Sequence, residues 1–256
     1  MLMIRGSKSV KANTELKVAA RKAGQDNVKW LQAQLPKEND GMLRLLLVGG
    51  AEPLHFRLRV AQSHFRHDMS PSHFSHVALL SIGARGRVKL WESALDSTNG
   101  FGYPPNDNGF RFGSLKDYAD PRKFPNVCLL TSGVAQEEVL ATERIRAFRH
   151  QRAALDVVAL VHAWLGYVWG VGEVRNPLQH EQGIPSAAAA EVLLANSGLD
   201  LTPGVSARAS CPEAIWQAAK WWQLPANVDA DLKKNALSGA FHIEHVLGRP
   251  PRRAES

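Results

Sequence analysis

The alternation of apolar and polar positions predicts that strands occupy the first half of this chain and helices the second. Apolar or alternating runs predict strands over 42–48, 54–61, 75–82, 87–92 and 126–131. From residue 135 the apolar spacing becomes helical. One long helix or two short ones are expected over 135–165, and further helices over 186–196, 212–222 and 229–237. This order favours an α+β fold with an antiparallel sheet and packed helices.

The ends of the chain differ from its centre. A helix is expected over 13–35, capped by Asn13 or Thr14 and followed by Pro36. We therefore divide the chain into an N-terminal helical extension over 1–41, a central α+β domain over 42–225, and a C-terminal helix with a basic tail over 226–256.

Composition excludes several classes of protein. The chain has 256 residues, of which 45% are hydrophobic, so it can bury a sizeable core. The formal net charge of +7 could attract nucleic acid or an anionic membrane surface, but the basic residues are spread along the chain. Without a nucleic-acid-binding motif, we expect no specific nucleic-acid partner, whereas contact with a membrane surface and the oligomeric state stay open.

The two cysteines, Cys128 and Cys211, are too few for a disulfide framework. The N-terminus lacks the apolar segment of a signal peptide. These features predict a protein that is cytoplasmic at synthesis, with secretion by a signal-peptide-independent route as an open alternative. Cys128 lies in an apolar run and is expected in the core.

A histidine and a glutamate are expected to share one sheet face. If strands 75–82 and 87–92 form a hairpin through the three-residue loop 84–86, with Gly86 in the left-handed conformation, Ala78 lies opposite Glu92. His76 then lies on the same face, two residues away. A carboxylate beside an imidazole fixes its tautomer and stabilises its charged form, as a general base requires.

Three histidine pairs have a spacing that could suit a metal: His64 with His67, His73 with His76, and His242 with His245. Neither a cysteine pair nor a His-Glu-x-x-His motif accompanies them. We therefore expect no metal and no other cofactor.

Five short motifs, in this order, resemble the circularly permuted, NlpC-type papain-like domains, whose relatives include the lecithin:retinol acyltransferase group. They are Ser75-His76-Val77-Ala78, Trp91-Glu92-Ser93-Ala94, Trp164-Leu165-Gly166-Tyr167, the helix from Ser186 to Leu194 with Ser197-Gly198-Leu199 behind it, and Ser210-Cys211-Pro212-Glu213. The resemblance covers roughly residues 50–222. It implies a papain-like fold for the domain over 42–225.

The resemblance also implies an activity. His76 would be the base, Glu92 its orienting group, and Ser186 would stand where the family has its nucleophilic cysteine. The implied chemistry is that of a cysteine-type hydrolase (an amidase or peptidase) or an acyltransferase, acting on a peptide, on peptidoglycan or on an acyl lipid.

The serine at position 186 leaves alternatives open, because a hydroxyl does not ionise as readily as a thiol. The chain could be an inactivated Cys-to-Ser form of a bacterial toxin or effector, or a natural serine variant. The nucleophile could instead be Cys211, at the start of the helix over 212–222. The alternative function is a catalytically dead papain-like module that binds a peptide or a lipid.

Overall fold

The computed structural model of the chain contains one seven-stranded sheet. It describes residues 15–83, 86–95, 108–151, 155–170, 172–226 and 237–244. The strand order is β1-β7-β6-β2-β3-β4-β5, and every pair except β1 with β7 is antiparallel. The strands are β1 (Leu16–Val18), β2 (Met42–Gly49), β3 (His76–Ile82), β4 (Val88–Glu92), β5 (Arg111–Gly113), β6 (Asn126–Ala135) and β7 (Ser238–His242).

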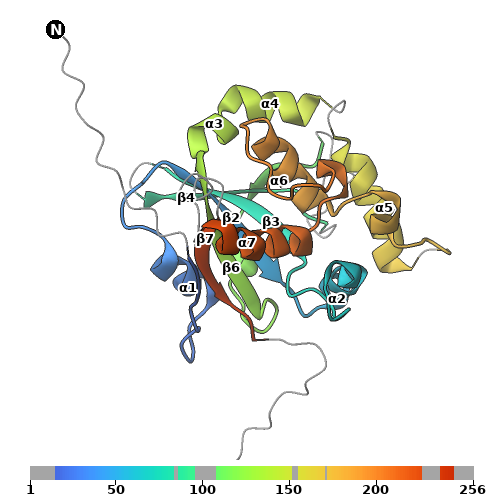
Figure 1. The fold of residues 1–256 in the computed structure, drawn as a ribbon, viewed down its shortest axis with the longest axis horizontal. Coiled ribbons are helices and arrows are strands. Elements are labelled where there is room, and N and C mark those ends of the chain that lie inside the picture. Colours follow the sequence, from blue (N-terminus) through green and yellow to red (C-terminus); the bar gives the residue numbers. More distant parts are fainter. Residues whose placement is uncertain are drawn as a thin grey trace, which may run out of the picture.

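The helices of the described residues fall between strands in the chain, most of them between β6 and β7 (Figure 1). They are α1 (Asn27–Gln34), α2 (Pro53–Ala61), α3 (Gln136–Leu140), α4 (Thr142–His150), α5 (Val157–Trp169), α6 (Pro185–Ala195) and α7 (Pro212–Ala226). Short 3-10 helices occur at Ser63–Phe65, Leu115–Tyr118, Pro177–His180 and Ala207–Ala209. Within the described residues the architecture is therefore α+β, with a mostly antiparallel sheet.

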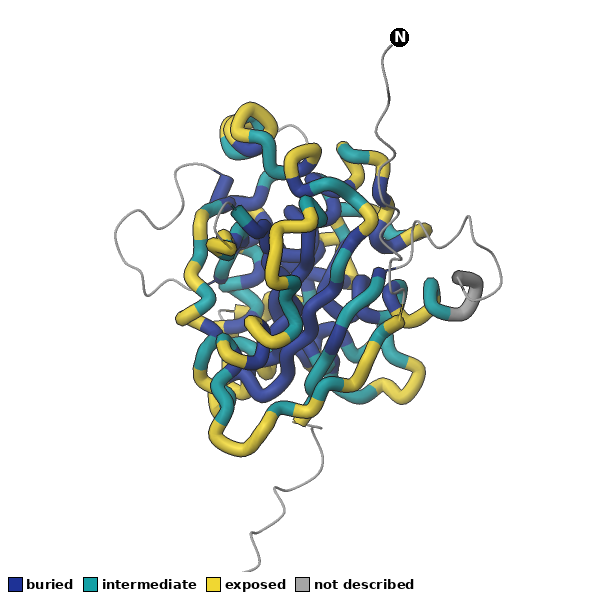
Figure 2. The backbone as a smooth tube through the Cα atoms, turned by 90° about the vertical axis from the view of Figure 1, so that its left-hand side faces the viewer, coloured by how far each residue is buried: buried dark blue, intermediate teal, exposed yellow. Residues whose placement is uncertain are grey.

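Two hydrophobic clusters lie on the two faces of the sheet. Val77 and Leu79 of β3 face a large cluster that includes the alanines of α6 and Trp164 of α5. Ala78 and Leu80 face a smaller cluster that includes Trp30 of α1. Side chains of a strand alternate between its faces, so α1 and α6 lie on opposite faces. Figure 2 shows the buried segments in the middle of the molecule and the exposed ones at its periphery.

Several predicted elements are confirmed. The strands expected at 42–48, 75–82, 87–92 and 126–131 are present, and the helices expected at 186–196 and 212–222 correspond to α6 and α7. The β3–β4 hairpin has the predicted register, because Leu79 pairs with Trp91. Gly86 has a φ of 69° in its turn, as expected for a left-handed glycine.

The strand predicted over 54–61 is wrong, because these residues form α2. Pro53 occupies the first turn, where a missing N–H costs nothing. Leu58 and Ala61 are buried, whereas Phe56 and Val60 are exposed, so the buried positions follow a helical spacing. The side chain of Arg59 is also buried. It donates to the carbonyls of Ser72 and Gly50, contacts that the local pattern does not reveal.

The single helix predicted over 13–35 is also wrong, since this segment contains β1 and then α1. Gly24 has a φ of 72°, which interrupts any continuous helix. Asp26 then caps α1 by accepting a hydrogen bond from the N–H of Lys29 over 2.7 Å. Residues 13 and 14 lie outside the described residues.

The region over 135–165 contains α3, α4 and the beginning of α5 rather than one or two helices. Most of the helix predicted over 229–237 lies outside the described residues. Strand β7, which was not predicted, follows it and pairs with both β6 and β1. A Cβ on Gly239 would collide with the carbonyl of Leu129, so close pairing here requires glycine.

The segments on either side of the central domain therefore contribute strands to the same sheet. β1 comes from the segment over 1–41 and β7 from the segment over 226–256. None of the helices in the described part of the chain is both long and apolar enough to span a membrane.

Candidate active site

The predicted juxtaposition of His76 and Glu92 is present in the structure. His76 begins β3 and Glu92 ends β4, and the register of the hairpin puts both side chains on the face that carries α1. The Nε2 atom of His76 lies 3.0 Å from Oε2 of Glu92. Both residues are buried. Because Nε2 is engaged by Glu92, Nδ1 is the ring nitrogen left for proton transfer.

Two further residues, which the sequence did not single out, contact Glu92. Tyr118 donates its hydroxyl to Oε2 of Glu92 over 2.5 Å, and its ring stacks on that of His76 at 5.5 Å between centroids. Arg111 of β5 lies 3.8 Å from Oε1. Burial alone would raise the pKa of the Glu92 carboxyl. The hydrogen bond and charge of His76, with help from Tyr118 and Arg111, reverse that effect and hold the pKa below its usual range.

Ser186 lies in the first turn of α6, and the chain before it is firmly held. Gly183 and Ile184 donate their N–H groups to the carbonyls of Arg208 and Ser210 over 2.5 and 2.9 Å, and the indole of Trp164 donates to the carbonyl of Gly183. A Cβ on Gly183 would collide with the carbonyl of Ser210, so glycine is needed there. These contacts fix the start of α6.

Ser186 meets strand β3 through the backbone of Val77, the residue after His76. The N–H of Val77 lies 3.2 Å from Oγ of Ser186 and donates to it. No hydrogen bond joins Oγ of Ser186 to the ring of His76 among the contacts of the described residues. α6 packs on one face of the sheet and His76 projects from the other, so Ser186 approaches His76 through the backbone at the start of β3 and not through its ring.

This arrangement favours negative charge at position 186. A helix N-terminus and a backbone N–H donor both stabilise an anion at the side chain that they face. For a thiol these effects lower the pKa, and for a hydroxyl they stabilise the oxygen as its proton leaves. The position therefore suits a nucleophile.

A buried carboxyl in the second half of α6 anchors the helix to the chain that follows it. Glu191 accepts hydrogen bonds from the hydroxyls of Thr202 and Ser210 and from the N–H of Leu201. Burial raises the pKa of Glu191 to about 7, and its hydrogen-bond donors offset only part of that rise. The helix that carries Ser186 thus depends on a carboxyl that titrates near neutral pH.

Cys211, the alternative nucleophile, is fully buried in the large hydrophobic cluster. Burial raises the pKa of its thiol to about 12, despite hydrogen bonds from the backbone at the start of α7. Cys128 is also fully buried, and burial raises its pKa well above the usual range. Neither cysteine has the exposed, electropositive surroundings of a reactive thiol.

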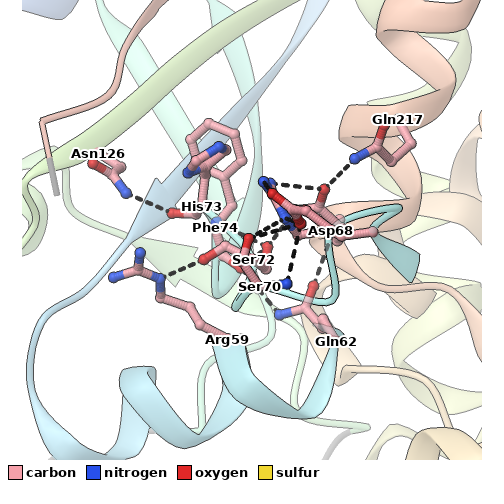
Figure 3. A network of polar contacts seen from close by, with 11 residues as sticks. Arg59, Gln62, Asp68, Ser70, Ser72, His73, Phe74, Asn126 and Gln217 are labelled. Atoms are coloured by element: carbon pink, nitrogen blue, oxygen red, sulfur yellow. Dashed lines mark hydrogen bonds and ion pairs between the residues drawn. The ribbon is translucent and has the colours of Figure 1, made fainter. Parts of the chain in front are cut away.

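A polar network fixes the loop that leads into His76 (Figure 3). Arg59 of α2 and Gln62, which caps that helix, donate to the carbonyls of Ser72 and Phe74, and Asn126 of β6 donates to the carbonyl of His73. The hydroxyl of Ser72 donates to Glu213, a fully buried carboxylate in the first turn of α7. The network joins three elements to the segment just before β3.

The histidine pairs do not form a metal site within the described residues. No group of three or more His, Cys, Asp or Glu side chains there could hold a metal ion. His76 is bound to Glu92, and burial together with nearby cations lowers the pKa of His73 to about 4. His245 lies outside the described residues.

Comparison of the sequence with models of known protein families, and searches among curated proteins and solved structures, found no match.

Proposed function

We propose that this chain is a hydrolase or acyltransferase of circularly permuted, NlpC-type papain-like architecture that works through a covalent acyl-enzyme on Ser186. The observation that carries the proposal is the buried 3.0 Å contact between His76 and Glu92, one residue from the N–H that binds Oγ of Ser186. A general base with its orienting carboxylate therefore lies next in the chain to the residue whose N–H binds a nucleophile at a helix N-terminus.

The residues take the following roles in the reaction. Oγ of Ser186 attacks the carbonyl carbon of an amide, ester or thioester while its proton passes around the start of β3 to Nδ1 of His76, which projects from the sheet face opposite α6. Glu92 stabilises the resulting imidazolium through Nε2. The N–H of Ser186 stabilises the oxyanion, because Pro185 has no N–H and the N–H groups of Ala187 and Ala188 donate to the carbonyl of Ile184.

His76 then returns the proton to the leaving group, and the acyl group stays on Oγ. Attack by water completes hydrolysis, and attack by an amine completes transfer. The substrates that suit this chemistry are a peptide, a peptidoglycan peptide or an acyl lipid.

A second candidate function has its own supporting observation. Ser186 and His76 are only 3% and 6% exposed, and Oγ of Ser186 is bonded to Val77 rather than to His76. A module that keeps the papain-like arrangement but binds a peptide or lipid without cleaving it fits these contacts.

Covalent labelling separates the two functions. The native chain would be treated with a fluorophosphonate probe, and the Ser186→Cys variant with iodoacetamide, across pH 5–9. The enzyme predicts that residue 186 is labelled in at least one form, and that His76→Ala slows the labelling by about tenfold or more. The matched control is His180→Ala, which changes an exposed histidine elsewhere.

Absence of labelling at residue 186 in both forms, with the fold intact by circular dichroism, would overturn the enzyme and favour the binding module. Labelling at Cys211 instead would identify that residue as the nucleophile.

A further inference from the structure

Tyr118 is held in the site by the N-terminal part of the chain. It ends the 3-10 helix Leu115–Tyr118, and its carbonyl accepts a hydrogen bond from Nδ2 of Asn27 over 2.9 Å. The same amide donates to the carbonyl of Phe124 over 2.8 Å. Asn27 is fully buried at the start of α1, so this helix fixes the position of the tyrosine.

The hydroxyl and the ring of Tyr118 contact two different members of the site. The hydroxyl donates to Oε2 of Glu92, the same oxygen that faces Nε2 of His76. The ring lies over the imidazole of His76 with an angle of 22° between their planes. Tyr118 is 6% exposed. Burial and the charge of Glu92 raise its pKa well above the usual range, so the phenol keeps its proton and donates at every working pH.

We propose that Tyr118 is a positioning residue that shares the charge of Glu92 with His76 and holds the imidazole in the orientation that leaves Nδ1 free. The inference rests on the proposed function, in which Nδ1 accepts the proton from Ser186. Two donors on one carboxylate oxygen compete for its charge, so each weakens the bond of the other. The stacked ring restricts rotation of the imidazole out of the Glu92 contact.

The test uses nuclear magnetic resonance, whose readout does not depend on activity. Tyr118→Phe keeps the ring and removes the donor. Since the hydroxyl is one of the groups that hold the pKa of Glu92 low, the carboxyl ¹³C signal of Glu92 should titrate at a pH higher by about 0.5 or more. Incorporation of 3,5-difluorotyrosine at position 118 makes the phenol a stronger donor and should shift the titration in the opposite direction.

Tyr167→Phe is the matched control, because Tyr167 contacts Trp164 and Arg57 but not Glu92. It should leave the Glu92 titration and the Nε2–H signal of His76 unchanged. Tyr118→Phe should also move that Nε2–H signal downfield, because the bond from His76 to Oε2 of Glu92 strengthens once the competing donor is removed. If both signals are the same in Tyr118→Phe, in difluorotyrosine-118 protein and in the native chain, the proposal is overturned.

A second readout relates the tyrosine to the reaction. In the Ser186→Cys background, Tyr118→Phe should shift the pH profile of alkylation at residue 186, whereas Tyr167→Phe should not. A shifted Glu92 titration without any labelling at residue 186 would support the positioning role of Tyr118 and count against the proposed enzyme. Labelling at residue 186 with an unchanged Glu92 titration would support the proposed enzyme and count against the positioning role of Tyr118.

Discussion

The backbone N–H of Val77 lies 3.2 Å from Oγ of Ser186, which joins strand β3 to the first turn of α6. Both groups are buried, since Val77 is 0% and Ser186 is 3% exposed. The contact therefore supports the fold as well as the site. Oγ of Ser186 supplies an acceptor for a backbone N–H of β3 that faces the start of α6.

Replacing Ser186 with Ala should destabilise the protein. The change leaves the N–H of Val77 buried without an acceptor, which costs about 1–2 kcal/mol in the free energy of unfolding. Urea denaturation measures this difference. Ser197→Ala, which removes a hydroxyl from the exposed side of the turn after α6, is the control and should have a smaller effect. Equal stability of Ser186→Ala and the native chain would mean that another acceptor replaces Oγ.

Stability should fall as the pH rises through about 7. Glu191 has an ordinary pKa of 4.5 and a folded pKa raised to about 7 by burial. The folded state therefore binds its proton more tightly than the unfolded state does. The resulting stabilisation is complete below pH 4.5, decreases above it, and is lost once the pH exceeds about 7. Its full size is on the order of 3 kcal/mol.

Glu191→Gln tests this pH dependence, because an amide is neutral at every pH. The free energy of unfolding of the variant minus that of the native chain should increase as the pH is raised from 5 to 8. Urea denaturation at each pH measures both free energies. Glu137→Gln, a change at an exposed position of α3, should leave the dependence unaltered. If plots of the free energy of unfolding against pH run parallel for Glu191→Gln and the native chain, Glu191 does not titrate in this range.

The two cysteines should be inert in the folded protein. Burial raises the pKa of Cys211 to about 12 and that of Cys128 well above its usual range, so almost no thiolate exists at pH 8. Ellman's reagent should react with neither thiol in buffer and with both in 8 M urea. Rapid reaction of one thiol in buffer would show that its region opens, and Cys211→Ala would identify which one.

Loss of the Glu213 carboxylate should destabilise the loop before His76. The side chain is fully buried and accepts hydrogen bonds from Ser72 and Gln217 at 2.7 and 2.5 Å, with Arg66 at 3.5 Å. Glu213→Ala leaves these donors without their acceptor and should cost about 2–4 kcal/mol. Thermal denaturation measures the loss. Asp68→Ala, at an exposed position beside Arg66, should cost clearly less, and similar losses for the two variants would contradict a central role for Glu213.

The sequence reveals the centre of the sheet because each central strand is longer than four residues and apolar. It also reveals the His76–Glu92 pair, because a short hairpin fixes which residues share a face. The alternation over 54–61 gave a wrong prediction because the apolar Phe56 and Val60 are exposed on α2. The polar Arg59 is instead buried and donates to the carbonyls of Ser72 and Gly50.

Tyr118 could not be predicted from local pattern. It is separated from Glu92 by 26 positions, and part of the intervening loop lies outside the described residues. Its position depends on Asn27, 91 residues earlier in the chain. No short motif encodes a contact of that range, and the three-residue strand β5, which brings Arg111 to Glu92, is too short for its periodicity to be recognised.

The parallel pairing of β1 with β7 has a consequence for the order of folding during synthesis. Of the strands in the described residues, β1 is the first that the ribosome delivers, yet its partner in the sheet, β7, is the last. Residues 16–18 must therefore remain unpaired with β7 while the intervening strands assemble. The edge of the sheet can close only after translation has passed residue 242, so among the described strands this pairing is the last that can form.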